Sequence, residues 1–215
     1  MSQVTFNTKS ASKKAVNKDV PFLEGGIHDN LIVKEIIVDK LPTGNYYMRF
    51  VYNQLETERI VQHTEFEPGR LPQWSDEQFQ DSVDNQINRI MNNHIKPYFA
   101  YNEDGTRMTE EQEDAAVPQF DGTSFLGFLK WVKETVEEVS NTVPVRVKVV
   151  YGKKGYTSLP NYSKYTSVEP MNTAKSMIVK LSIDNFEPIK VDDESNVTVK
   201  PEISEKLTKT SDLPF

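Results

Sequence analysis

The sequence of 215 residues predicts an α+β fold that is mainly β. Three short segments come first, and each has the length and the Val, Ile, Tyr and Phe content of a strand: residues 31–38, 46–53 and 58–66. Two segments with apolar residues at helical spacing follow, and then two segments that alternate between apolar and polar residues like half-buried strands. This order predicts a five-stranded barrel with a two-helix insertion between its third and fourth strands.

The second strand has two different faces, because successive side chains of a strand point to opposite sides. Residues 46, 48, 50 and 52 are large and apolar or aromatic, and we expect them in the core. Tyr47 and Arg49 lie on the opposite face and offer a ring and a guanidinium to the outside. The turn 41–45 before this strand contains Gly44 and Asn45, which tolerate positive φ.

The first helix is expected to begin after Ser75, which forms a capping-box pattern with Gln78, and to end at Pro97. The second is expected over residues 125–139. Between them, residues 102–114 contain six acidic residues and one Arg, and we interpret this segment as an acidic surface loop. Its spacing matches no known cation-binding loop.

The last two strands are expected at residues 145–151 and 176–186. In the first of them, Val145, Val147 and Val149 should point inward and Arg146 and Lys148 outward. Tyr151 has the inward parity, so it either packs in the core or needs a bulge. Residues 176–186 show the clearest apolar and polar alternation in the chain.

Both ends of the chain are polar and are expected to be flexible. Residues 1–23 form a basic arm, residues 24–189 the folded domain, and residues 190–215 an acidic tail. The chain has a net charge of -7. It contains no cysteine, and this fits a reducing cytoplasm. It has no stretch of about 20 apolar residues, so no membrane partner is expected.

No motif of a known enzyme class is present, and we expect a protein that is not an enzyme and needs no cofactor or metal. The phosphate-binding, dinucleotide-binding, zinc-protease and serine-hydrolase patterns are absent. The three histidines, His28, His63 and His94, lie far apart in the sequence. His63 and Glu65 share a strand face and suggest an acid/base pair, but such pairs often arise by chance in strands.

The most informative stretch is residues 145–166, which carry five basic residues, four tyrosines and no acid. Cations attract phosphates regardless of sequence, and flat rings offer unpaired bases a stacking surface. Cations interleaved with tyrosines therefore favour binding of a single-stranded nucleic acid. The alternative is a strand followed by a solvated loop, because Tyr is common in strands and Lys on surfaces.

The order of strands and helices is that of an oligonucleotide-binding (OB) barrel with an enlarged insertion. The sequence also resembles the single-stranded DNA-binding proteins of tailed phages. GIHDNLIVKEI, YYMRFVYN, HTEFEP and VRVKVVYGKKGYTSLPNY carry this resemblance, which covers most of residues 24–170 loosely. The C-terminal SDLPF is similar to the acidic tip, ending in Pro-Phe, of bacterial single-stranded DNA-binding proteins. The two-helix insertion departs from the simple pattern.

These observations predict a protein that binds single-stranded DNA during phage replication or recombination in the host cytoplasm. The residues expected to neutralise phosphates are Arg49, Arg146, Lys148, Lys153, Lys154 and Lys164. Those expected to stack on bases are Tyr47, Tyr151, Tyr156, Tyr162 and Tyr165. The residues expected to dock onto replication or recombination proteins are Asp212, Leu213, Pro214 and Phe215. The alternative is a virion or assembly protein that uses an OB-like domain for protein–protein interaction.

Overall fold

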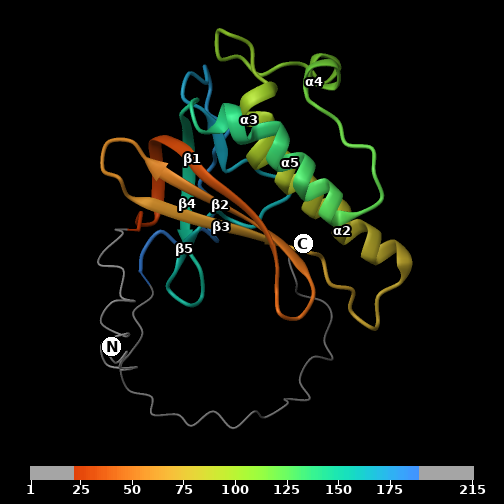
Figure 1. The fold of residues 1–215 in the computed structure, drawn as a ribbon. Helices are drawn as coiled ribbons and strands as arrows, with labels where there is room; N and C mark the ends of the chain where they lie inside the picture. Colours follow the sequence, from red (N-terminus) through yellow and green to blue (C-terminus); the bar gives the residue numbers. More distant parts are fainter. Residues whose placement is uncertain (1–21, 189–215) are drawn as a thin grey trace, which may run out of the picture.

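The computed structural model describes residues 22–188, which contain six strands and, between the third and fourth of them, a helical region (Figure 1). The strands are β1 Gly26–Lys40, β2 Tyr46–Gln54, β3 Ile60–Phe66, β4 Val145–Tyr151, β5 Thr157–Ser158 and β6 Val168–Pro170. The predicted acidic tail lies outside the described residues, as does all of the predicted basic arm except residues 22 and 23. Leu23 is buried, and its amide donates to the carbonyl oxygen of Ile60 at 2.8 Å.

The strands form a nearly closed, antiparallel, barrel-like sheet. Hydrogen-bonded neighbours follow the order β3-β2-β1-β4-β5, and β6 also pairs with β4. The two ends of this order come together, because β5 lies against β3 and a hydrogen bond of 3.0 Å joins His63 Nδ1 to Ser158 Oγ. Strands 1 to 4 were predicted correctly in order, although β1 is longer than expected.

β1 is long enough to pair with β2 along one part and with β4 along another. Its register shifts between Val33 and Glu35 in the first pairing and between His28 and Leu31 in the second. Asn30 has φ 58° between these pairings, a conformation that Asn tolerates better than most residues. These irregularities bend β1 so that one strand serves two sides of the barrel.

The helical region contains more elements than predicted: α2 Asp76–Ile90, the π-helix η1 Met91–Ile95, α3 Lys96–Phe99, α4 Glu110–Ala116 and α5 Phe125–Ser140. The predicted capping box at Ser75 and Gln78 is present. Pro97 does not end the helical stretch as expected, because it lies in the first turn of α3, where its missing N–H is tolerated. The predicted acidic loop also contains the start of α4, which has its own capping box at Thr109 and Gln112.

The core lies between the sheet and the helices, which cover one side of the barrel in Figure 1. α5 contributes Phe128, Leu129, Val132 and Val136, and Val145, Val147 and Val149 of β4 point inward as predicted. None of the helices in residues 22–188 is long and apolar enough to cross a membrane.

The predicted strand at residues 176–186 is not formed. Residues 171–188, here called the strap, run without strand structure against β1 and β4. The Val179 carbonyl accepts a hydrogen bond from a lysine side chain, and the Met177 amide donates to the Glu169 carboxylate at 2.8 Å, so neither group joins a ladder. The burial is also reversed, since Ile178 is buried while Met177, Val179 and Ile183 are exposed.

Candidate nucleic-acid interface

Lys148, predicted to contact phosphate, does not face solvent. Its side chain is fully buried beneath the strap, and its Nζ donates to the Val179 carbonyl oxygen at 2.8 Å and to Asp184 Oδ2 at 3.1 Å. Lys148 therefore lies on the outer face of β4 but is not accessible to a phosphate in this structure. The alternation of β4 is correct, but the strap covers the outer face of this strand at Lys148, which the local sequence does not reveal.

Tyr162 is half-buried and bonds to the same group. Its hydroxyl donates to Asp184 Oδ1, and its ring centroid lies 5.0 Å from Lys148 Nζ. Burial, together with the neighbouring Asp184 carboxylate, raises the pKa of Tyr162 above its usual value. The Tyr165 ring packs edge-on against Tyr162 with centroids 6.2 Å apart and remains 43% exposed. In this fold Tyr162 holds the strap, and Tyr165 is the more accessible of these two rings.

Arg146 is partly exposed but is already paired with two carboxylates. Its Nε lies 2.6 Å from Asp29 Oδ1 and its Nη1 lies 3.1 Å from Glu169 Oε1. Hydrogen bonding to Asp29, and then to Glu169, raises the pKa of this guanidinium despite partial burial. A phosphate would have to compete with both acids, so Arg146 offers little free positive charge.

The β4–β5 hairpin keeps the exposure that the sequence predicted. Lys153 and Lys154 are exposed in the turn between Gly152 and Gly155, and Gly155 adopts φ +77°, which favours glycine. Tyr156 is 78% exposed. Tyr151 is half-buried opposite Thr157, and its amide donates to the carbonyl oxygen of Asn185 at 2.7 Å. Lys164 is exposed in the loop that follows.

A second group, here called the platform, lies on the outer face of β2 and β3 and consists of Tyr47, Arg49 and Phe66. Tyr47 and Phe66 are cross-strand partners whose ring centroids lie 6.2 Å apart at an angle of 44°. The Arg49 guanidinium carbon lies 5.5 Å from the Tyr47 ring centroid, and its Nε donates to Thr64 Oγ1 at 3.2 Å. Phe66 is 51% exposed. The platform therefore offers aromatic surface and one cation to solvent.

Sequence reasoning identified Tyr47 and Arg49 but missed Phe66. The alternation of β3 contains the signal: His63 and Glu65 are buried, so Thr64 and Phe66 must point outward. An aromatic residue on an outward position is informative only once the inward set is known. Here the inward set contains two polar residues, His63 and Glu65, beside Val61, so polarity alone does not identify it.

Tyr47 and Phe66 of the platform lie at the end of β2 and β3 next to the β1–β2 turn. In Figure 1 the β1–β2 turn and the β4–β5 hairpin both project from the lower side of the barrel, with β2 and β3 between them. Charge differs between the two sides, because β1 ends there in the exposed pair Asp39 and Lys40, which balance each other, whereas the β4–β5 hairpin carries Lys153 and Lys154 with no acid in its turn. A polyanion on the platform is therefore favoured toward the β4–β5 hairpin.

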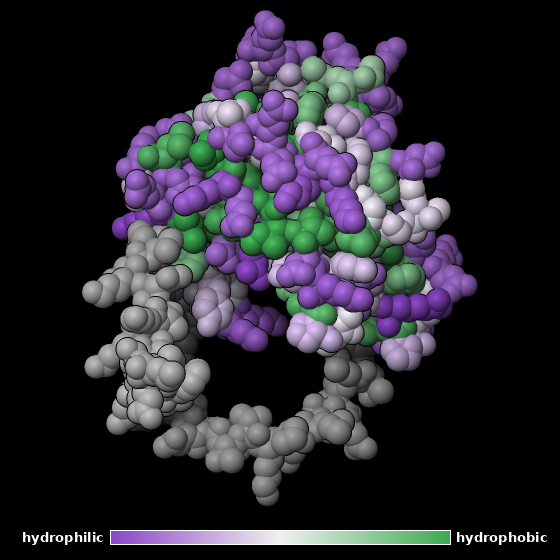
Figure 2. Space-filling model, viewed as in Figure 1, coloured by the Kyte–Doolittle hydropathy of each residue, from purple (hydrophilic) through white to green (hydrophobic). Residues whose placement is uncertain are grey.

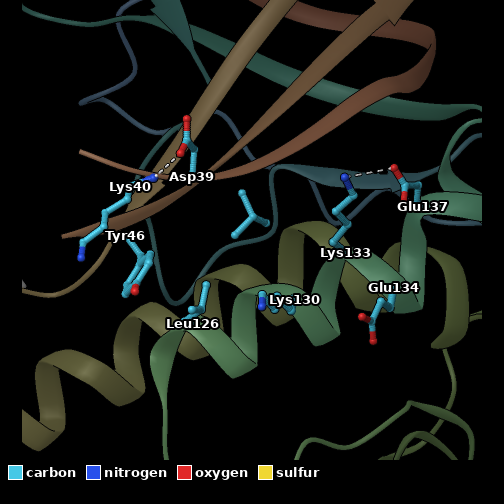
Figure 3. Close-up of a pocket in the computed structure, with 9 residues that line it drawn as sticks. Asp39, Lys40, Tyr46, Leu126, Lys130, Lys133, Glu134 and Glu137 are labelled. Atoms are coloured by element: carbon cyan, nitrogen blue, oxygen red, sulfur yellow. Dashed lines mark hydrogen bonds and ion pairs between the residues drawn. The ribbon is translucent and has the colours of Figure 1, made fainter. Parts of the chain in front are cut away.

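A hollow of about 450 Å³ between α5 and the end of the β1–β2 hairpin is a weaker candidate site (Figure 3). Its lining includes three lysines and three acids, so it presents no field of a single sign. Lys133 Nζ lies 3.4 Å from Glu137 Oε1 on the same helix. Val38 and Leu126 add apolar surface there, and Figure 2 shows a band of hydrophobic residues between the sheet and the helices on this face.

Comparison of the chain with protein-family models, with curated proteins and with solved structures gave no match.

Proposed function

We propose that this protein binds single-stranded DNA without strong sequence preference, through the platform and the β4–β5 hairpin. The observation that carries the proposal is the contact between Tyr47, Phe66 and Arg49 on an open face of β2 and β3. A base has a flat face of its own and stacks on such rings for roughly 1–3 kcal/mol. Lys153 and Lys154 supply the charge that attracts the phosphates.

The arrangement of the sheet supports an OB-like reading of the barrel. Going around it, the strands follow the order β1-β2-β3-β5-β4, and the helices lie between β3 and β4. OB-folds bind oligonucleotides on the face of strands 2 and 3 and through the loops between strands 1 and 2 and between strands 4 and 5. The platform and the basic hairpin occupy the corresponding places. The resemblance to tailed-phage proteins adds a role in DNA replication or recombination in the host cytoplasm.

Binding of a labelled single-stranded oligonucleotide, compared with a blunt duplex of the same sequence, tests this proposal. We expect much tighter binding of the single strand, because stacked base pairs cannot expose their faces to the platform. Equal affinity for the duplex would mean that charge alone drives binding and that no base stacks on the platform. Absence of binding at low salt would refute the proposal.

We further propose that Asp212, Leu213, Pro214 and Phe215, which lie outside the described residues, bind replication or recombination proteins. An apolar anchor with a rigid proline and two negative charges suits a pocket with a basic rim. Removal of these four residues should leave single-strand affinity equal or slightly higher and abolish capture of partners from infected-cell extract. Identical captured proteins with both forms would contradict this role.

A second candidate function is protein–protein interaction in virion assembly, and one observation favours it. A groove of about 720 Å³ lies between α2, residues 117–125 and α5. Its lining includes Phe79, Val83, Phe120, Phe125 and Trp131. Its lining also includes three acids, Glu67, Glu113 and Asp114, and one lysine, Lys96, so its net charge disfavours a nucleic acid. If the oligonucleotide experiment fails, this groove becomes the leading candidate site.

A further inference from the structure

β3 places two polar side chains in the interior of the barrel, where apolar residues are usual. His63 and Glu65 are each 1% exposed, and His63 Nε2 lies 2.9 Å from Glu65 Oε1. No substrate reaches such a pair, so the acid/base role that their spacing suggested has no access to solvent. Burying two ionisable groups costs free energy, so their presence in the core requires another explanation.

The π-helix η1 brings a third such side chain, His94, to the same place. His94 is 1% exposed, and the Phe50 ring lies parallel to it with the ring centroids 3.6 Å apart. One nitrogen of each histidine and one Glu65 oxygen all lie within 4.8 Å of one another. Single π-helical turns inside α-helices occur frequently at functional sites, because they redirect a side chain that a regular helix would aim elsewhere.

Each histidine of this cluster is held from behind by a further polar group. Tyr52 Oη lies 2.8 Å from His94 Nδ1, and Ser158 Oγ lies 3.0 Å from His63 Nδ1. Glu65 is held by Arg89, which donates to both carboxylate oxygens, and by Gln86, which donates to Oε2 at 3.2 Å. Fixing the far nitrogen of each imidazole through a hydrogen bond is what metal sites do to orient their ligands.

The Nε2 atom of His94 is buried and has no hydrogen-bond partner among residues 22–188. Leaving a polar atom unpaired at this depth costs stability, so such an atom calls for an explanation. A neutral imidazole with Nδ1–H directed to Tyr52 has a free lone pair on Nε2.

We propose that His63, Glu65 and His94 bind one Zn²⁺ ion, with water as the fourth ligand. Two imidazoles and one carboxylate form a recognised zinc ligand set, and imidazole selects transition metals over Mg²⁺ and Ca²⁺. The ion links β3 to η1 and so joins the barrel to its helical cover. This inference is independent of the proposed binding of DNA.

Zinc binding requires Nε2 of His63 to exchange its hydrogen bond to Glu65 for a bond to the ion. Without metal, this Nε2 donates to Glu65 Oε1 at 2.9 Å. With metal, Nε2 ligates the ion and Nδ1–H donates to Ser158 Oγ. Arg89 also neutralises Glu65, so we expect weaker affinity than at a thiolate site.

Metal titration of the full-length, tag-free chain, stripped with a chelator, tests the site. We expect calorimetry to show one Zn²⁺ per chain, the melting temperature to rise with Zn²⁺, and Co²⁺ to produce visible absorption bands. His94→Gln should lose all three responses. His28→Gln removes an imidazole outside the cluster and should keep them.

Ser158→Ala provides a second variant if His94→Gln does not fold, since it removes only the hydroxyl that orients His63. Loss of such an outer partner should weaken zinc binding by roughly 10–100-fold. The proposal is overturned if the wild-type chain takes up no Zn²⁺ or Co²⁺. It is also overturned if folded His94→Gln, or Ser158→Ala, binds them as tightly as the wild type does.

Discussion

Lys148 and Lys153 are both basic and close in sequence, but their surroundings give them different roles. Lys148 is buried with Asp184 beneath the strap, whereas Lys153 is exposed in the β4–β5 turn. A buried ion pair tolerates the loss of one partner poorly, because the other charge remains without compensation. An exposed lysine contributes little to folding and remains available to a phosphate.

Lys148→Ala should therefore lower the free energy of unfolding by roughly 3 kcal/mol, because Asp184 loses its buried cation and keeps only the hydrogen bonds from Tyr162 and the Leu181 amide. Lys153→Ala should change it by less than about 0.5 kcal/mol. Urea denaturation of the two variants measures the difference. A Lys148→Ala variant as stable as the wild type would mean that the strap does not cover this lysine in solution.

Replacing either aromatic ring of the platform should weaken binding of single strands. Phe66→Ala and Tyr47→Ala should each cost about 1–3 kcal/mol of affinity if the ring stacks on a base. Phe22→Ala is the matched control, since Phe22 is 56% exposed and lies outside the platform. Fluorescence anisotropy with a labelled oligonucleotide gives the affinities. If Phe22→Ala weakens the affinity as much as the two platform variants do, the platform is not the binding site.

Among the elements, the β4–β5 hairpin is expected to determine the salt dependence of binding. Each phosphate contact with a single strand contributes a slope of about -0.7 in log K against log salt. Lys153→Gln together with Lys154→Gln should therefore flatten the slope by about 1.4. The corresponding double change of Lys130 and Lys133 on α5 serves as the control and should leave the slope unchanged. A flatter slope in the control alone would move the interface to the hollow beside α5.

The elements that could be predicted from the sequence are those whose burial follows their own periodicity. The first four strands, α2 with its capping box and α5 all follow a local pattern. Residues 176–186 also alternate clearly but form no strand, since their backbone groups bond to the Lys148 and Glu169 side chains. Those partners come from elsewhere in the chain, so no local pattern contains them.

The candidate site divides in the same way. Tyr47, Arg49, Lys153, Lys154 and Tyr156 could be identified because a strand face or a turn determines their exposure. The sequence could not show that Lys148 and Tyr162 bond to Asp184, or that Arg146 pairs with two carboxylates. These contacts join residues that are far apart in the sequence. The same holds for the His63, Glu65 and His94 cluster, whose members come from β3 and from a π-helix that no periodicity signals.

The whole molecule should lose stability in acid because of the buried Glu65. Burial alone would raise the pKa of Glu65, but hydrogen bonds from Arg89 and His63 outweigh it and hold the pKa far below the ordinary 4.5. Around pH 4 and below, Glu65 therefore binds a proton in the unfolded chain but not in the folded chain. The free energy of unfolding decreases as the pH is lowered through this range. This contribution is fully present above the ordinary pKa.

Buried His94 should add to the loss at a higher pH. Its pKa lies well below the ordinary 6.5, so stability starts to fall as the pH drops below that value. Urea denaturation between pH 8 and pH 3 should show both phases, and Glu65→Gln should reduce only the lower one. A curve for Glu65→Gln that is parallel to the wild type would show that Glu65 is not ionised in the folded core.

The central claim is that single-stranded DNA lies across β2 and β3 toward the β4–β5 hairpin. Photocrosslinking with an oligonucleotide that contains 5-iodouracil tests it most directly, because this base forms bonds with aromatic side chains on which it stacks. Mass spectrometry should locate crosslinks at Tyr47, Phe66 and Tyr156, and competing unlabelled single strand should suppress them. Crosslinks confined to the α2–α5 groove, for example at Phe79 or Trp131, would contradict this account.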